Sequence, residues 1–157
     1  MQFVEDFCST SFVIVVNGYF PSLSVKQILT TISESLLGFA GSFSNVMDHV
    51  LFVNSKIPGW AATHSDIYII IHNIDGVRLR SDITQNVLSI LASNPHVHIV
   101  ASIDHINAPI LWDHDKLFRF NWLWHDCTSF ERYLLETSYA NSVFVHGGTV
   151  SVAGRRG

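Results

Sequence analysis

The sequence predicts an α/β fold with three layers, in which a mostly parallel β-sheet lies between helices on both faces. Two observations indicate this fold. Short apolar runs that suit buried strands alternate along the chain with segments of helical periodicity. Several of these runs end directly in polar residues, as strands do at the ligand-binding edge of open α/β sheets. The composition, 157 residues with 48% hydrophobic and 14% charged, suits one compact domain.

The first predicted strand runs from Ser11 to Asn17 and is closed by Gly18. It is preceded by the tail of a short helix over residues 1–10. Ser22 or Ser24 is the candidate N-cap of the helix that follows the strand, because a serine side chain accepts a hydrogen bond from the first helical turn. The apolar residues of this helix recur at helical spacing, and glycines at 38 and 41 interrupt it: Val25, Ile28, Leu29, Ile32, Leu36 and Leu37.

A second helical pattern extends from Phe43 to Leu51, and Pro58-Gly59 predicts a loop before the next strand. That strand is the apolar run Ile67–Ile71. Five consecutive apolar residues predict a strand buried on both faces, as in the middle of a parallel sheet. The run leads into His72 and Asn73, so this end of the strand is the first place to look for chemistry.

The second half of the chain shows the same alternation of predicted helices and strands. Arg78–Ser93 predicts a helix that carries four residues inward, namely Ile83, Val87, Leu88 and Leu91, and His96–Asp104 predicts another strand. A short segment follows from Pro109 to Phe118. Phe120–Cys127 alternates in a way that predicts a strand with two indoles on one face. The segment from Glu131 to Ser142 suits either a helix or a loop, and Val143–Val145 suits one more strand.

Charge, cysteines and hydropathy exclude several classes of protein. A net charge of −4 with only nine Lys plus Arg offers no basic stripe that could neutralise a DNA backbone alone. Cys8 and Cys127 form no CxxC pair, which favours a reduced intracellular protein. The first residues carry acids, and we expect neither a signal peptide nor a transmembrane helix, hence no membrane partner.

The polar end of the Ile67–Ile71 strand predicts an inactive nucleotide site. Phosphate-loop NTPases place acids there to hold Mg²⁺ and position water, whereas this chain has His72 and Asn73, with Asp75 as the sole carboxylate. Neither a GxxxxGK[ST] loop nor a GxGxxG motif occurs in the sequence. The competing hypothesis is an active phosphate-loop NTPase whose loop lies upstream of Met1.

A cluster of histidines and aspartates between residues 104 and 115 raises a metal-dependent hydrolase as a further alternative: Asp104, His105, Asp113, His114 and Asp115. The cluster has no HExxH motif or repeated Cys/His spacing. This favours loop side chains that bind backbone groups or cap helices, and we expect no metal. Trp112, Trp122 and Trp124 are candidates for the core or for a surface that faces a partner.

Longer strings of residues carry a family resemblance. They are Val15–Pro21 with Ser24-Val25-Lys26, Ile71–Asp75, Ala101–Pro109 with Trp112-Asp113-His114, Phe120–Trp124 and Glu136–Ser142. In this order they resemble the origin recognition complex subunit 2 family. The resemblance covers Phe12 to Val145, nearly the whole chain.

The resemblance implies a divergent AAA+/RecA-like domain that is incomplete, lacking the family's first strand with its phosphate loop and its C-terminal lid. Residues 1–145 would form this partial domain, and residues 146–157 a flexible C-terminal tail. ATP hydrolysis and a bound cofactor are not expected. The degenerate nucleotide-site positions would be His72, Asn73, Asp75, Asp104 and Asn107.

The resemblance also implies a function, a location and partners. The chain would be a non-catalytic subunit of the origin recognition complex in the nucleus, contributing to origin DNA binding and helicase loading through the assembled complex. Its partners would be the other subunits, subunit 3 first. Four aromatic residues are candidates for the interface: Trp112, Trp122, Trp124 and Tyr139.

Overall fold

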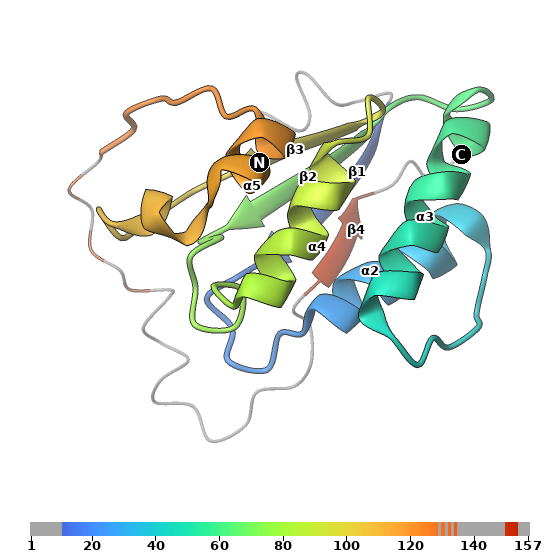
Figure 1. The fold of residues 1–157 in the computed structure, drawn as a ribbon, viewed down its shortest axis with the longest axis horizontal. Helices are drawn as coiled ribbons and strands as arrows, with labels where there is room; N and C mark the ends of the chain where they lie inside the picture. Colours follow the sequence, from blue (N-terminus) through green and yellow to red (C-terminus); the bar gives the residue numbers. More distant parts are fainter. Residues whose placement is uncertain (1–10, 129, 131, 133, 135–149, 154–157) are drawn as a thin grey trace.

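The structure is a computed structural model that describes residues 11–128, 130, 132, 134 and 150–153, the last four by their backbone only. Three parallel strands form the sheet, β1 (Phe12–Asn17), β2 (Ile67–His72) and β3 (Val97–Ala101), and β4 (Val150–Ala153) pairs antiparallel to β1. The strand order is β3-β2-β1-β4 (Figure 1). The predicted α/β class with a mostly parallel sheet is therefore confirmed.

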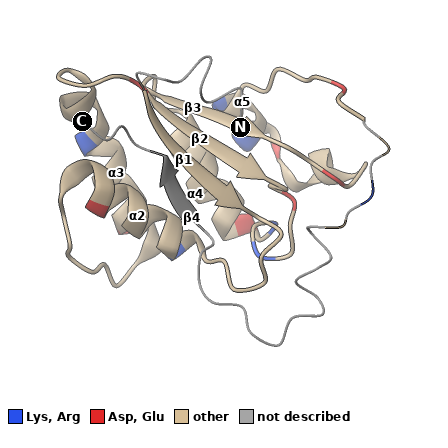
Figure 2. Ribbon diagram, turned by 180° about the vertical axis from the view of Figure 1, so that it is seen from behind, with Lys and Arg blue, Asp and Glu red and all other residues tan. Residues whose placement is uncertain are grey.

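The described helices cover one face of this sheet, as comparison of Figures 1 and 2 shows. They are α2 (Val25–Leu37), α3 (Val46–Ala61), α4 (Asp82–Ala92), the 3₁₀ helix η1 (Ala108–Leu111) and α5 (His114–Phe120). In Figure 2 the open face of the sheet is turned toward the viewer. Within the described ranges, no helix is long and apolar enough to cross a membrane.

The main hydrophobic core lies between the sheet and these helices. Ile14 and Val16 of β1 and Ile69 of β2 pack there with buried residues of α2, α3 and α4, such as Leu29 and Leu88. The burial of these aliphatic side chains is the principal stabilising contribution to the domain.

The opposite face of the sheet is less thoroughly covered than the sequence predicts. Val13 and Val15 are buried there, but Tyr68 and Ile70 of β2 are only partly buried. The prediction that β2 is buried on both faces was therefore wrong in degree. The second helical layer expected on this face is not among the described residues.

Local signals fixed the start of α2. Ser24 is its N-cap, and its side chain accepts a hydrogen bond from the Lys26 backbone N–H, while Gln27 completes a capping box. The helix ends at Gly38, whose φ of 61° belongs to the left-handed region that glycine favours. Of the two serines proposed as caps, Ser24 is thus the one used.

Helix α3 continues through Pro58-Gly59, where the sequence predicts a loop. Proline lacks the N–H that would bind the carbonyl oxygen of Asn54, four residues earlier. The side-chain amide of Asn94 donates to that carbonyl oxygen at 3.2 Å and to the Asn54 side-chain oxygen at 2.8 Å. This distant asparagine replaces the missing hydrogen bond, which explains why the helix tolerates the proline.

Helix α4 is shorter than predicted and differs at one core position. It begins after Ser81, whose hydroxyl accepts from the Thr84 backbone N–H, and not at Arg78. Ile83, expected to point inward, is 63% exposed. The buried face of the first turn is formed by Thr84 and Gln85 instead.

The predicted strand over Phe120–Cys127 does not form. Asp113 caps α5, which includes Phe120 and ends at Asn121 with a φ of 49°, and residues 121–127 contain no strand. The left-handed turn at Asn121 breaks the alternation on which the prediction rested.

Within the range 146–157, for which the sequence predicts a tail, Val150–Ala153 pairs with β1 as β4. The predicted helix tail before Ser11, the strand at Val143–Val145, the candidate Tyr139 and most of the segment 131–142 lie outside the described residues.

Candidate functional site

The carboxyl ends of β1, β2 and β3 meet at one edge of the sheet, as parallel strands must. The backbone at the end of β2 is fully engaged there. The carbonyl oxygen of His72 accepts from the Gly18 N–H at 2.7 Å, and the Asn73 N–H donates to the Ser102 hydroxyl at 2.9 Å. Asn73 has a φ of 59°, so the chain turns sharply at this position.

Asp75, the only carboxylate at the end of β2, serves the neighbouring loop. Its side-chain oxygens accept hydrogen bonds from the backbone N–H groups of Asp104 at 3.3 Å and of His105 at 2.9 Å. The Nδ1 atom of His105 in turn accepts from the Asn107 N–H at 3.1 Å. The five predicted nucleotide-site positions are therefore close together, but three of them, Asp75, Asp104 and Asn107, contribute to contacts that hold two loops in place.

Two glycines let the loops pack backbone against backbone. A Cβ atom on Gly18 would collide with the carbonyl oxygens of His72 and Asn73, and one on Gly76 would collide with the carbonyl oxygen of Gly18. Such close approach is open only to glycine. The ends of β1 and β2 are thus joined into one rigid unit at this edge.

The metal hypothesis for residues 104–115 gains no support from this geometry. The described residues contain no group of three or more His, Cys, Asp or Glu side chains placed to hold a metal ion. Asp113 caps α5 by accepting from the Lys116 backbone N–H at 2.9 Å. Its hydrogen bonds with Lys116 lower the pKa of the Asp113 carboxyl, as expected for an engaged carboxylate.

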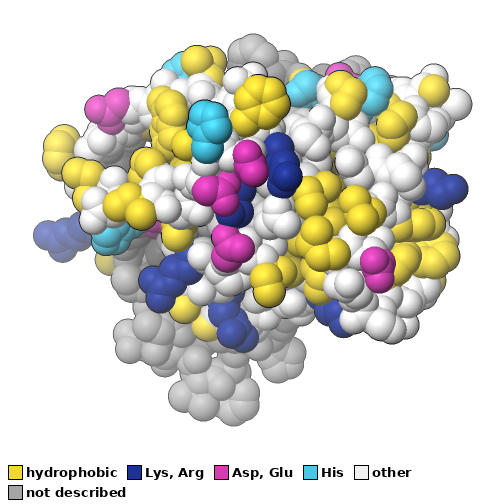
Figure 3. Space-filling view, viewed as in Figure 1, with side chains coloured by type: hydrophobic (Ala, Val, Ile, Leu, Met, Phe, Trp, Pro, Cys, Tyr) yellow, Lys and Arg dark blue, Asp and Glu magenta, His cyan; other side chains and the backbone are white. Residues whose placement is uncertain are grey.

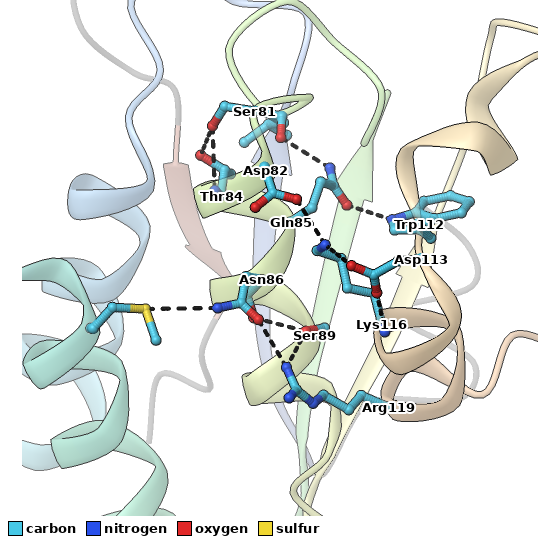
Figure 4. Close-up of polar contacts among 12 residues, drawn as sticks. Ser81, Asp82, Thr84, Gln85, Asn86, Ser89, Trp112, Asp113, Lys116 and Arg119 are labelled. Carbon is cyan, nitrogen blue, oxygen red and sulfur yellow. Dashed lines mark hydrogen bonds and ion pairs between the residues drawn. The ribbon is translucent and has the colours of Figure 1, made fainter.

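Behind the loops, Gln85 of α4 ties three segments together (Figure 4). This side chain is 0% exposed, and its amide nitrogen donates to the carbonyl oxygens of Ile74 and Leu79 at 3.0 Å each. Its amide oxygen accepts from the indole N–H of Trp112 at 2.6 Å. A buried amide with all of these bonds in place specifies one arrangement of α4 and the two loops.

Lys116 of α5 joins the same assembly and is only 5% exposed. Its ammonium group donates to carboxylate oxygens of Asp82 at 2.8 Å and Asp113 at 2.5 Å, and these hydrogen bonds raise the pKa of Lys116. Arg119, one turn later, donates to the Asn86 side-chain oxygen at 2.8 Å (Figure 4). These contacts fasten α5 to α4.

Sequence reasoning missed Gln85 and Lys116. For Gln85 a signal was present, because it lies three residues before Leu88 and hence on the same, buried face of the helix. Lys116 carried no comparable signal, since its burial depends on two aspartates, one of them in another helix.

The tryptophans predicted as partner-facing have three different environments. Trp112 is 4% exposed and belongs to the core, which corrects its assignment to an interface. The Trp122 indole stacks on Phe120, and its buried N–H has no acceptor among the described residues. Trp124 is 53% exposed and remains a candidate for a contact surface.

Exposed apolar side chains gather around η1, α5 and the segment that follows. We call them the α5 apolar surface: Ile106, Ile110, Phe118, Leu123 and Trp124. Three of them, Ile106, Ile110 and Phe118, have exposed fractions of 89%, 81% and 83%. Figure 3 shows hydrophobic side chains at the surface over this part of the molecule. Large exposed apolar residues in one region are typical of protein contact surfaces.

The fold and the strand ends define a RecA-type α/β domain. The polar residues at the carboxyl edge of its sheet bind backbone groups and hold the loops in place. A family model described as the origin recognition complex subunit 2 RecA-like domain matches residues 1–127. The chain therefore belongs to the origin recognition complex subunit 2 family, and the resemblance inferred from the sequence is confirmed.

Individual relatives agree with this assignment. Origin recognition complex subunit 2 of Xenopus laevis is 43% identical over 132 residues, which is 84% of this chain and 23% of that protein. The Drosophila melanogaster protein is 41% identical over 145 residues, 92% of this chain and 23% of its own length. The chain thus spans about a quarter of these curated relatives.

Solved structures show the same domain. A chain in the structure of Drosophila ORC bound to GC-rich DNA and Cdc6 superimposes with a TM-score of 0.82 at 41% identity, covering 90% of this chain and 49% of that one. A chain in the structure of Drosophila ORC bound to DNA gives a TM-score of 0.77 at 40% identity, covering 87% of this chain and 77% of that one. This chain thus spans about half of the first of these matched chains and about three quarters of the second.

Proposed function

We propose that this chain acts as a non-catalytic subunit of the origin recognition complex in the initiation of DNA replication. The observation that carries the proposal is the strand edge, where Asp75 binds the loop backbone at Asp104 and His105. A hydrolytic site needs a carboxylate free to hold Mg²⁺ or to orient water. In this chain His72 and Asn73 stand where those acids are expected, and the one carboxylate at this strand end, Asp75, stabilises the fold instead.

The partners follow from the same reasoning. The net charge of −4 supports DNA binding through an assembled complex and not through this chain alone. Family relatives occur in structures of Drosophila ORC bound to DNA. We infer that the chain binds the other subunits, subunit 3 first, contributes through them to origin DNA binding and helicase loading, and works in the nucleus.

The α5 apolar surface is the candidate contact with a neighbouring subunit. Its residues are exposed, and one of them, Phe118, lies on α5, the helix that Lys116 and Arg119 hold against α4. Because α5 is fastened to α4, Phe118 is presented on a fixed backbone that loses little entropy on binding, which favours an interface here. We include Trp124 and propose Tyr139 as a further contact residue.

Co-expression with affinity-tagged subunits tests this proposal. We expect the chain to co-purify with subunit 3, and Phe118→Ser and Trp124→Ser to reduce recovery of the complex. Val77→Ser is the matched control, because Val77 is 72% exposed but outside the α5 apolar surface. Equal recovery of all variants would reject this surface as the contact, and no recovery of the folded parent chain would reject the proposed function.

The two rival functions have specific tests. An active phosphate-loop NTPase, assayed in a chain that includes the segment upstream of Met1, would hydrolyse MgATP at a rate that falls on Asp75→Asn, whereas we expect no hydrolysis with either chain. A metal-dependent hydrolase would retain stoichiometric metal after purification, measured by elemental analysis, and we expect none.

A further inference from the structure

A groove opens where α2, α3 and α4 begin, and its volume is about 520 Å³. Residues from the first turns of all three helices line it, including Lys26 of α2, Val46 and Met47 of α3, and Asp82 and Ile83 of α4. The three helices therefore direct their N-terminal ends toward the same space. In Figure 3 hydrophobic side chains gather over the region of α3 and α4, beside a cluster of charged groups.

The wall of the groove is partly apolar. Ile83 is 63% exposed, although a helical position of this kind is expected to face the core. Met47 is partly buried, and its sulfur lies 4.0 Å from the side-chain nitrogen of Asn86, which connects α3 to α4 across the groove. An apolar side chain from another molecule would find contact surface here that water covers in the free chain.

The electrostatic field of the groove favours a negative group beside α2. Helix N-termini carry partial positive charge, which acidic residues in the first turn usually offset. Asp48 does so in α3 and Asp82 in α4, but the first turn of α2 has no acid and carries Lys26.

This placement of Lys26 is unfavourable for α2 itself, because its charge adds to the positive end of the helix dipole. Among the described residues it forms no ion pair, and the Asp82 carboxylate is already engaged by Lys116. The charge of Lys26 also helps to lower the pKa of His49, after the larger effect of burial. A cation at a helix N-terminus departs from the usual charge preference of helices, and such departures are expected at functional sites.

We propose that this groove binds an acidic, apolar segment of a partner protein. An apolar side chain of the segment packs on Ile83 and Met47, and a neighbouring carboxylate lies beside Lys26 at the start of α2. A nucleic acid would supply the negative charge but no aliphatic side chain to pack on Ile83. This inference is independent of the proposed role in the origin recognition complex, because the groove belongs to the chain itself.

Methyl NMR on the full chain provides a direct test, because the sequence contains only two methionines, Met1 and Met47. The probe is a short synthetic peptide in which leucine and aspartate alternate, titrated into protein labelled at the methionine methyl groups. We expect the Met47 signal to shift in a saturable manner and the Met1 signal to stay in place.

Three comparison ligands separate the possible occupants. Replacing aspartate by lysine, or leucine by serine, in the peptide is expected to abolish the saturable shift of Met47. A short DNA duplex is expected to leave Met47 unchanged. If the lysine peptide binds equally well, if the DNA shifts Met47 in place of the peptide, or if no ligand shifts it, the proposal is wrong.

Variants at exposed positions keep the fold intact while they test each half of the groove. Lys26→Gln is expected to weaken the peptide affinity about threefold, as for a solvent-exposed ion pair. Ile83→Ser is expected to weaken it about fivefold through lost apolar contact. Leu51→Ser is the control, because Leu51 is 55% exposed on α3 and does not line the groove. Equal effects of the control and the two groove variants would refute the assignment.

Discussion

Replacing Gln85 by leucine tests the most informative contact in the structure. The Gln85 side chain is 0% exposed and forms three hydrogen bonds, two to the carbonyl oxygens of Ile74 and Leu79 and one to the Trp112 indole N–H. Leucine has a similar volume but can satisfy none of these groups. The fold would keep its packing and lose only the polar connections.

The size of the effect follows from those three groups. A buried polar group that loses its partner costs about 1–3 kcal/mol, so three of them cost at least about 3 kcal/mol. The more apolar leucine side chain offsets about 1 kcal/mol of this loss. We therefore expect Gln85→Leu to lower the free energy of unfolding by at least about 2 kcal/mol, a large part of the stability of a domain this size.

Urea denaturation followed by circular dichroism measures that loss. A double-mutant cycle with Trp112→Phe, which removes the indole N–H, isolates the bond between the two side chains. We expect a coupling energy of about 1 kcal/mol, because each single variant breaks the same hydrogen bond. A Gln85→Leu protein as stable as the parent, within about 0.5 kcal/mol, would refute the role given to Gln85.

Three further predictions concern the loops and the ionisable groups. Gly76→Ala is expected to destabilise the chain by about 1–3 kcal/mol in urea denaturation through its collision with the neighbouring loop, whereas Gly59→Ala, in an open position of α3, stabilises it slightly. Burial, and secondarily the charge of Lys26, lowers the pKa of His49. The unfolded chain therefore takes up a proton that the folded chain does not, and the stability should fall as the pH drops below about 6.5. His49→Gln should flatten this pH dependence in thermal melts. Hydrogen bonds from His96 and His98 lower the pKa of Asp66, so its contribution is present above about pH 4 and lost in more acidic solution, and Asp66→Asn should remove that acid dependence. A His49→Gln or Asp66→Asn protein with the parent's pH profile would contradict the assignment.

Sequence patterns predicted the elements whose signals are local. The apolar run at Ile67–Ile71 became a central strand, and Ser24 became a helix cap, because strand burial and capping depend on residues close in sequence. The clustering of the polar positions at the strand ends was also predictable, since parallel strands place their carboxyl ends at one edge.

The errors arose where a distant residue decides the local structure. Helix α3 passes through Pro58 because Asn94 donates to the carbonyl oxygen that proline leaves unpaired. Trp112 lies in the core, where Gln85 of another segment offers its indole N–H an acceptor. The sequence did not predict the groove at Ile83 either, because helical spacing alone placed this side chain in the core, whereas it is exposed. Propensity and periodicity contain no information about such partners.

The central claim, that this chain acts by assembling with other subunits and not by catalysis, is tested most directly by light scattering coupled to size-exclusion chromatography. The chain would be mixed with purified origin recognition complex subunit 3 at equal concentrations. We expect one peak with the mass of a one-to-one complex. Two separate peaks, with this chain folded and monomeric, would contradict the claim.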